Sequence, residues 1–317
     1  MSRKRKILIT GGAGNIGSAL ANGLLLSDDN QVIIFDNLIT GSKEKLPSSN
    51  NTNWSFIKGD VNVKDEITDV MLSHRFDYVF HYAAMVGVQR TQENPLAVLK
   101  DIEGIRNILD LSKNTGVKRF HYSSSSEVYG EPVHIPQNEI YTPLNSRVPY
   151  AVVKNVGEAY LKSYHQEYGL DYSIFRFFNT YGPRQSRDFV ISKFLAAALK
   201  NEDITIFGEG NQTRTFCYID DNIDFTLKCF QNDLMVNEIV NVGSHEVISI
   251  LELAELIIAI SGSKSKIIFL PPLEDGDMKR RQPDNSKMRK VLNRDLITLS
   301  AGIEKMLKTP ELILYNS

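Results

Sequence analysis

A strand, a glycine-rich turn, a helix and a second strand follow one another within residues 7–36, and this order constrains the fold more than any other feature. Residues 7–10 (ILIT) form a short, apolar and largely β-branched run, and TGGAGNIG (10–17) follows directly. A helical pattern extends over about 16–26, and QVIIFD (31–36) has the composition of a second buried strand. The pattern predicts a βαβ unit, because a helix is the usual crossover between two parallel strands.

The glycines of this turn are spaced as a pyrophosphate-binding turn requires. Gly11 permits a sharp turn after the strand, Gly14 lets the backbone approach an anion, and Gly17 lets the helix pack closely. The helix start then presents the N–H groups of Asn15 and Ile16, together with the positive end of the helix dipole. The turn therefore predicts a dinucleotide site.

The residue that ends the second strand indicates which dinucleotide is bound. The carboxylate of Asp36 can accept both ribose hydroxyls of NAD, and it would repel the 2′-phosphate of NADP. Asn37 follows, where a chain that binds NADP more often has a basic residue. The sequence predicts NAD.

Strand and helix patterns continue to alternate after this unit. Strands are expected at 54–60, 78–84, 119–124 and 172–178, and helices at 95–114 and 149–168. We predict an α/β fold with a Rossmann-type, doubly wound parallel sheet. Ligands of such sheets bind at the carboxyl ends of the strands, where the sequence has Asp60 and Val61, Ala83 and Ala84, and Ser123 to Ser125.

The helix expected at 149–168 carries a candidate general base. Tyr150 and Lys154 are four residues apart and share one helix face. A free tyrosine is a weak base near neutrality, but a lysine ammonium and the positive nicotinamide ring both favour its phenolate. A serine hydroxyl from the preceding strand end can complete the proton relay.

Composition and residue counts exclude several other classes of protein. The chain has 317 residues, 42% of them hydrophobic, and a net charge of −2, which argues against nucleic acid as a partner. No apolar run approaches the roughly 20 residues of a membrane helix. The two cysteines and six histidines lack the spacing of a disulfide framework or a metal site. We expect a cytoplasmic protein without a metal.

The full series of motifs resembles the extended short-chain dehydrogenase/reductase family, in its nucleotide-sugar epimerase/dehydratase branch. The resemblance covers nearly the whole chain. Besides the glycine turn and Asp36, it rests on GDV (59–61), HYAA (81–84), SSSSEVYG (123–130), YAVVK (150–154), RFFNTYGPRQ (176–185), FGEGNQTRTFCYIDD (207–221), NVGS (241–244) and GDMKRRQPD (276–284).

This resemblance implies a role for each matching residue of the catalytic and cofactor sites. Tyr150 takes a proton from a sugar hydroxyl while hydride passes to NAD, and Lys154 orients the nicotinamide ribose. Ser125 matches the catalytic Ser or Thr of the family, and Ser123 and Ser124 are expected to bridge the strand end to cofactor and substrate. Asp60 and Val61 would hold the adenine, with Ala83 and Ala84 also beside the cofactor.

The resemblance also implies residues that bind the nucleotide sugar. Ser125 and Ser126 would contact the sugar, and Asn179 would contact the diphosphate. Arg214 and Arg280 would pair with the diphosphate, with Arg281 as an alternative to Arg280, because the guanidinium fork suits phosphate.

The resemblance further implies two domains and a homodimer. An NAD-binding domain is expected over 1–178 and a smaller α/β substrate domain over 179–317, with a segment near 216–230 returning to the first. The helices at 95–114 and 149–168 would pair with those of a second subunit.

The leading activity is 4-epimerisation of a UDP-sugar through transient oxidation at C4. Nucleotide-sugar 4,6-dehydration and UDP-glucuronate decarboxylation remain alternatives, and a non-catalytic NAD-binding sensor is a more remote one. Glu127 bears on this choice, since family dehydratases and decarboxylases often carry an acid there. It either reaches the sugar near C5 or C6 or merely caps and salt-bridges its loop.

Overall fold

The computed structural model describes residues 3–272 and 280–309 of the chain. The chain divides into two compact units, which are described separately below. Unit 1 comprises Met1–Val128, Ser146–Arg176 and Ile223–Val240, and unit 2 comprises Tyr129–Asn145, Phe177–Asn222 and Asn241–Ser317.

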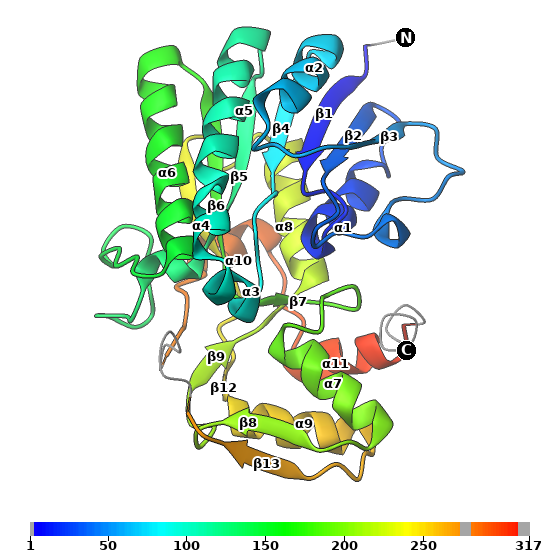
Figure 1. Cartoon of the computed structure of the whole chain (residues 1–317), viewed down its shortest axis with the longest axis vertical. Helices are drawn as coiled ribbons and strands as arrows, with labels where there is room; N and C mark the ends of the chain where they lie inside the picture. The colour runs from blue at the N-terminus through cyan, green and yellow to red at the C-terminus, as the bar shows by residue number, and fades with distance from the viewer. Residues whose placement is uncertain (1–2, 273–279, 310–317) are drawn as a thin grey trace. The chain divides into compact units, whose positions relative to one another are not determined.

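A seven-stranded sheet forms the centre of unit 1 (Figure 1). Its strand order is β11-β6-β5-β4-β1-β2-β3, and the neighbouring strands from β3 to β5 pair in parallel. The strands are β1 (Arg5–Thr10), β2 (Asn30–Asp36), β3 (Trp54–Lys58), β4 (Tyr78–His81), β5 (Arg119–Ser125), β6 (Asp171–Phe177) and β11 (Glu238–Val242). The order reverses between β1 and β4, which is where doubly wound sheets bind their ligands.

Helices cover both faces of this sheet. Helices α2, α5 and α6 stand next to one another on one face (Figure 1), and α1 packs against α8 on the other, where Gly23 meets Leu227. Their bounds are α1 (Asn15–Leu24), α2 (Lys64–His74), α3 (Val88–Glu93), α4 (Pro95–Leu99), α5 (Asp101–Thr115), α6 (Pro149–Tyr168) and α8 (Ile219–Gln231). Two short 3-10 helices are η1 (Lys43–Lys45) and η2 (Ser126–Tyr129).

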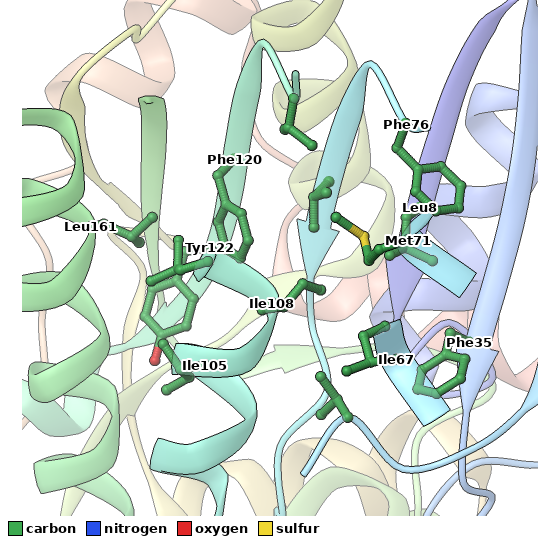
Figure 2. Close-up of a cluster of buried hydrophobic side chains, with 14 of the residues drawn as sticks. Leu8, Phe35, Ile67, Met71, Phe76, Ile105, Ile108, Phe120, Tyr122 and Leu161 are labelled. Atoms are coloured by element: carbon green, nitrogen blue, oxygen red, sulfur yellow. The ribbon is translucent and has the colours of Figure 1, made fainter. Parts of the chain in front are cut away.

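One hydrophobic core cluster of unit 1 lies between the sheet and the layer formed by α2, α5 and α6. Figure 2 shows Phe120 and Tyr122 of β5 among side chains of α2, α5 and α6, such as Met71, Ile108 and Leu161. All five side chains are fully buried. Because side chains alternate along a strand, burial of Phe120 and Tyr122 on this face directs Ser124 to the same side.

Unit 2 is built from short strand pairs and helices. Its strand pairs are β10 with β7, β12 with β9, and β13 with β8. The strands are β7 (Thr180–Tyr181), β8 (Ile204–Phe207), β9 (Thr213–Thr215), β10 (Cys217–Tyr218), β12 (Val247–Ser249) and β13 (Ile267–Leu270). The helices are α7 (Val190–Lys200), α9 (Ile250–Ser261), α10 (Ser286–Leu292) and α11 (Leu299–Leu307). A capping box between Ser249 and Glu252 begins α9.

The predicted α/β, Rossmann-type fold is confirmed, with local differences at strand ends and within one helix. The strands expected to end at residues 60 and 84 end at Lys58 and His81. The helix expected over 95–114 is two helices, α4 and α5, because the chain tightens at Lys100, whose carbonyl accepts from Glu103 N three residues on. Within the described ranges, no helix is both long and apolar enough to cross a membrane.

Candidate active site

The glycine turn after β1 has a geometry that larger residues could not adopt. Gly11 has φ +69°, and a Cβ there would lie 2.5 Å from the backbone nitrogen of Ala83. A Cβ on Gly17 would collide with the carbonyl oxygen of Gly11. The close approach at Gly17 is therefore between α1 and the turn, and the turn in its own right lies against the loop after β4 at Gly11.

The start of α1 has the features of an anion site. Gly14 is the N-cap residue, no described side chain caps the helix, and its first turn has no acidic residue. Backbone N–H groups at Asn15 and Ile16 therefore face outward at the positive end of the helix. These residues fit the pyrophosphate of NAD, which Gly14 would let approach without a Cβ in its way.

Asp36 connects the end of β2 to this turn. Its carboxylate accepts from the backbone N–H of Ala13 at 2.9 Å and of Leu38 at 2.8 Å. Burial raises the pKa of Asp36, and these two hydrogen bonds partly offset the rise. Each oxygen keeps a lone pair for a ribose hydroxyl. The neighbouring Asn37 uses its side-chain oxygen to accept from Ile39 N at 3.0 Å.

The loops after β3 and β4 are joined by the carboxylate of Asp101, which belongs to none of the sequence motifs. Asp101, at the start of α5, accepts from Asn62 Nδ2 at 3.1 Å and from Met85 N at 2.8 Å. Asn62 follows the predicted adenine contacts Asp60 and Val61, and Asp60 Oδ1 accepts from Asn62 N at 2.9 Å. A single sequence does not distinguish Asp101 from any acid that begins a helix.

The loop after β4 contains Ala83 and Ala84, both half-buried. Ala83 N donates to Thr10 Oγ1 at 3.4 Å, and Ala83 is also the residue that Gly11 approaches. The predicted cofactor residues of β1, β2 and β4 therefore lie at one edge of the sheet, at its switch point.

The serine run has a different partner at each position. Ser123 Oγ donates to the carbonyl of His81 at 3.2 Å, and Ser125 Oγ accepts from Glu127 N at 3.2 Å. Ser126 is almost fully buried, and Glu127 is half-buried at the start of η2. Ser124 does not bridge the strand end to the site as expected. It faces α6, where it donates to Glu158.

Lys154 is held against the end of β5. Its ammonium donates to the carbonyl of Ser123 at 2.6 Å and to Ser123 Oγ at 3.3 Å, and its nitrogen lies 5.7 Å from the centre of the Tyr150 ring. Burial lowers the pKa of Lys154 to about 8, and the charge of Asp101 opposes this shift. A cation beside the phenol ring is the arrangement that favours a phenolate.

Unit 2 contains the residues predicted for the diphosphate. Asn179, which has φ +41°, donates from Nδ2 to the carbonyl of Thr215 at 2.8 Å. Arg214 is buried, and its Nη1 donates to the carbonyl of Thr213 at 2.8 Å.

The two candidate arginines of GDMKRRQPD differ in exposure. Arg280 is exposed and forms a β-bridge with Thr213, whereas Arg281 is buried. The β-bridge brings the backbone of this segment beside β9, which carries Arg214. Residues 276–279 of the motif lie outside the described residues.

Comparison with known proteins identifies relatives along nearly the whole chain. The chain is 34% identical over 316 residues to UDP-glucuronic acid decarboxylase 1 of Arabidopsis thaliana, covering 96% of this chain and 70% of that protein. It is 35% identical over 305 residues to a putative UDP-glucose 4-epimerase of Methanocaldococcus jannaschii, covering 95% and 96%. The structure of UDP-N-acetylglucosamine 4-epimerase from Methanobrevibacter ruminantium M1, in complex with UDP-N-acetylmuramic acid, superposes with a TM-score of 0.89 at 32% identity, covering 100% of both chains.

The model of the NAD dependent epimerase/dehydratase family matches residues 7–243, from the first strand of the sheet to beyond its last. This span includes the glycine turn, the serine run and the Tyr150–Lys154 pair. The chain belongs to the NAD-dependent epimerase/dehydratase family, whose members modify nucleotide sugars.

Proposed function

We propose that this protein is a UDP-sugar 4-epimerase that uses bound NAD as a hydride carrier. The observation that carries the proposal is the Tyr150–Lys154 pair on α6, with Lys154 anchored to Ser123 at the carboxyl end of β5. UDP occurs in the names of all three relatives described above.

NAD would supply reversible hydride transfer at C4 of the sugar. Tyr150 removes the proton of the C4 hydroxyl and later returns it, while Lys154 keeps the phenolate stabilised. Ser125 donates a hydrogen bond to the reacting oxygen. Epimerisation requires no further acid or base, because the keto sugar only rotates and is reduced on its other face.

In this proposal, unit 2 binds the nucleotide sugar. Arg214 and Arg280 pair with the diphosphate, since guanidinium groups bind phosphate oxygens in pairs. Asn179 contributes a further contact to the same diphosphate, and Arg281 is the alternative to Arg280.

UDP-glucuronate decarboxylation is the second candidate, and Glu127 is the observation that favours it. Glu127 lies two residues after Ser125, and its backbone N–H is bonded to the Ser125 hydroxyl. This hydrogen bond fixes the backbone of Glu127 next to Ser125, which in this proposal contacts the reacting sugar. A half-buried carboxylate in that place can act as a base or a hydrogen-bond partner near C5.

Product analysis separates these activities. The purified protein is incubated with UDP-glucose, UDP-N-acetylglucosamine, UDP-glucuronate and dTDP-glucose, and the products are analysed by mass spectrometry and NMR. We expect a product of unchanged mass with inverted configuration at C4. Loss of carbon dioxide from UDP-glucuronate would establish the decarboxylase, loss of water would establish a 4,6-dehydratase, and no turnover of any sugar would favour a sensor.

The same proposal includes a homodimer formed through α4, α5 and α6. Leu96 of α4 is 77% exposed and Tyr168 of α6 is 53% exposed, so apolar surface remains on this helix layer in one subunit. Light scattering at twice the monomer mass is expected, and a Leu96→Glu variant should shift that mass toward the monomer. A wild-type monomer would refute the dimer and leave the proposed reaction unaffected.

A further inference from the structure

A buried charged cluster lies on the helix that carries Tyr150 and Lys154. Ser124 Oγ donates to Glu158 Oε1 at 2.5 Å, and Arg176 of β6 donates to both oxygens of Glu158, from Nε at 2.8 Å and from Nη2 at 2.6 Å. Each of the three residues is no more than 2% exposed. The cluster therefore joins β5, α6 and β6 by three charge-assisted hydrogen bonds.

Helix geometry connects this cluster to the catalytic residues. Tyr150, Lys154 and Glu158 follow one another at intervals of four residues, so they form one stripe along α6. Lys154 bonds Ser123 while Glu158 bonds Ser124, so neighbouring residues of β5 hold successive turns of the helix. A shift of α6 along the strand would have to break both attachments together.

The chemistry of the cluster suits it to aligning α6 on the sheet better than to stabilising the fold. A buried ion pair often contributes little net stability relative to apolar residues of similar volume, because both charges lose their hydration. It nevertheless penalises misalignment strongly, because a displaced helix would leave a charge buried without its partner. Apolar contacts, such as those of Leu161 further along α6, do not discriminate small displacements in this way.

We propose that Glu158, Arg176 and Ser124 are positioning residues that fix the register of α6 on β5, and thereby place Tyr150 and Lys154 against the serine run. The inference rests on the proposed function for its effect on turnover, whereas the placement of Lys154 can be tested without any reaction.

The principal test replaces the whole cluster by apolar side chains. The triple variant Ser124→Ala, Glu158→Met, Arg176→Met removes both charges together and leaves neither unpaired. We expect a urea midpoint close to that of wild type, KM within about twofold, and kcat reduced about 100-fold, as for a small misplacement of a catalytic group. A crystal structure of the variant with NAD should show that the hydrogen bond from Lys154 to the Ser123 carbonyl is lost.

Controls separate this inference from the proposed function. Ser173→Ala removes a buried hydroxyl of β6, the strand next to β5, that donates to the carbonyl of Met235, and it should leave kcat unchanged. Tyr150→Phe tests the proposed base. The positioning role of the cluster would be overturned if the triple variant keeps Lys154 in place and retains wild-type kcat. This holds even if Tyr150→Phe is inactive. If wild type and Tyr150→Phe are equally inactive, the proposed function fails, and the variant's crystal structure still decides the placement of Lys154.

If the triple variant does not fold, Ser124→Ala alone decides the question, because it leaves the Glu158–Arg176 pair intact. A several-fold fall in kcat, with KM and the urea midpoint matching those of Ser173→Ala, supports the inference. Unchanged kcat in Ser124→Ala contradicts it.

Discussion

Lys154 and Arg176 are buried cations of the same unit, and the fold treats their charges in opposite ways. Arg176 meets a carboxylate with both ends of its guanidinium fork. Among the described residues, Lys154 donates to the neutral carbonyl and hydroxyl of Ser123, and burial lowers its pKa to about 8. The first arrangement neutralises a charge locally. The second leaves a charge available to act on Tyr150.

The difference indicates where the protein gives up folding stability for function. Unpaired or poorly paired buried charges cost stability, and they persist where chemistry requires a perturbed group. A paired buried charge costs little while both partners are present. Mutations at the two places should therefore change stability in opposite directions, which makes the comparison testable.

Replacement of Tyr150, the residue on which the Lys154 charge acts, should give the largest effect, and this effect is on kcat. Tyr150→Phe should lower kcat by about 10²- to 10⁴-fold, because the general base is lost while the ring remains. The free energy of unfolding should change by no more than about 0.5 kcal/mol. Tyr164→Phe is the control, since it removes from the same helix a hydroxyl that donates to Asp110. Near-normal turnover by Tyr150→Phe would remove Tyr150 from the mechanism.

Breaking the ion pair between Arg176 and Glu158 should give the next largest effect, which is a loss of stability. Arg176→Met leaves the carboxylate of Glu158 buried without its cation, which costs about 3–5 kcal/mol. Arg119→Met is the control, because the partner of Arg119 is Asp233, whose side chain is 73% exposed and remains hydrated when unpaired. Urea denaturation should therefore show a much smaller loss for Arg119→Met. Equal losses would mean that the burial of the remaining carboxylate is not decisive.

Removal of the Lys154 charge should stabilise the protein. With a pKa of about 8 in place of its ordinary 10.5, Lys154 destabilises the fold by about 3 kcal/mol at pH 7. Loss of its hydrogen bonds to Ser123 offsets part of this gain, so Lys154→Met should be more stable by about 1–2 kcal/mol. Turnover and NAD affinity should both fall.

The sign of the pH dependence provides a second test of the Lys154 charge. Between about pH 8 and 10.5 the unfolded chain binds a proton at Lys154 that the folded chain does not. Wild-type stability therefore rises with pH in this window relative to Lys154→Met, and the advantage of the variant shrinks. An advantage that is constant from pH 7 to 10 would contradict the assigned burial penalty.

The fold could be predicted because its signals are local. The glycine turn, the acid at the end of β2 and the alternating apolar runs each occupy a few consecutive residues, and together they specify a parallel sheet. The break between α4 and α5 could not be predicted, since Lys100 keeps helical backbone angles and only the hydrogen-bond pattern changes there. The sequence contains no Gly or Pro at that position.

The candidate site could be predicted only as far as its motifs extend. Tyr150 and Lys154 belong to one recognisable spacing, but Asp101 joins two loops through contacts that form only in the folded chain. The same limit applies to Ser124. Its orientation toward Glu158 depends on which face of β5 the neighbouring Tyr122 buries, and the serine run gives no hint of that alternation.

His121 is a third buried ionisable residue, and unlike Lys154 and Arg176 it is neutral. Its replacement should give the smallest change in stability at pH 7. Its ring lies 4.2 Å from the ring of Phe80, centre to centre, with 7° between the planes, and it is fully buried. Neither ring nitrogen has a hydrogen-bond partner among the described residues. Burial lowers the pKa of His121 well below 6.5, so the folded chain keeps the ring neutral.

His121→Phe should therefore stabilise the protein by about 1 kcal/mol at pH 7, since it removes two unsatisfied polar atoms at the cost of some crowding from a larger ring. Below pH 6.5 the unfolded wild type gains a proton at His121 that the folded state excludes. The stability difference should then grow by up to about 1.4 kcal/mol for each pH unit. The exposed His134 provides the control, as His134→Phe should show no such growth. Urea midpoints at pH 7 and pH 5.5 are sufficient, and a His121→Phe advantage that does not increase on acidification would mean that the folded protein protonates or hydrates this ring.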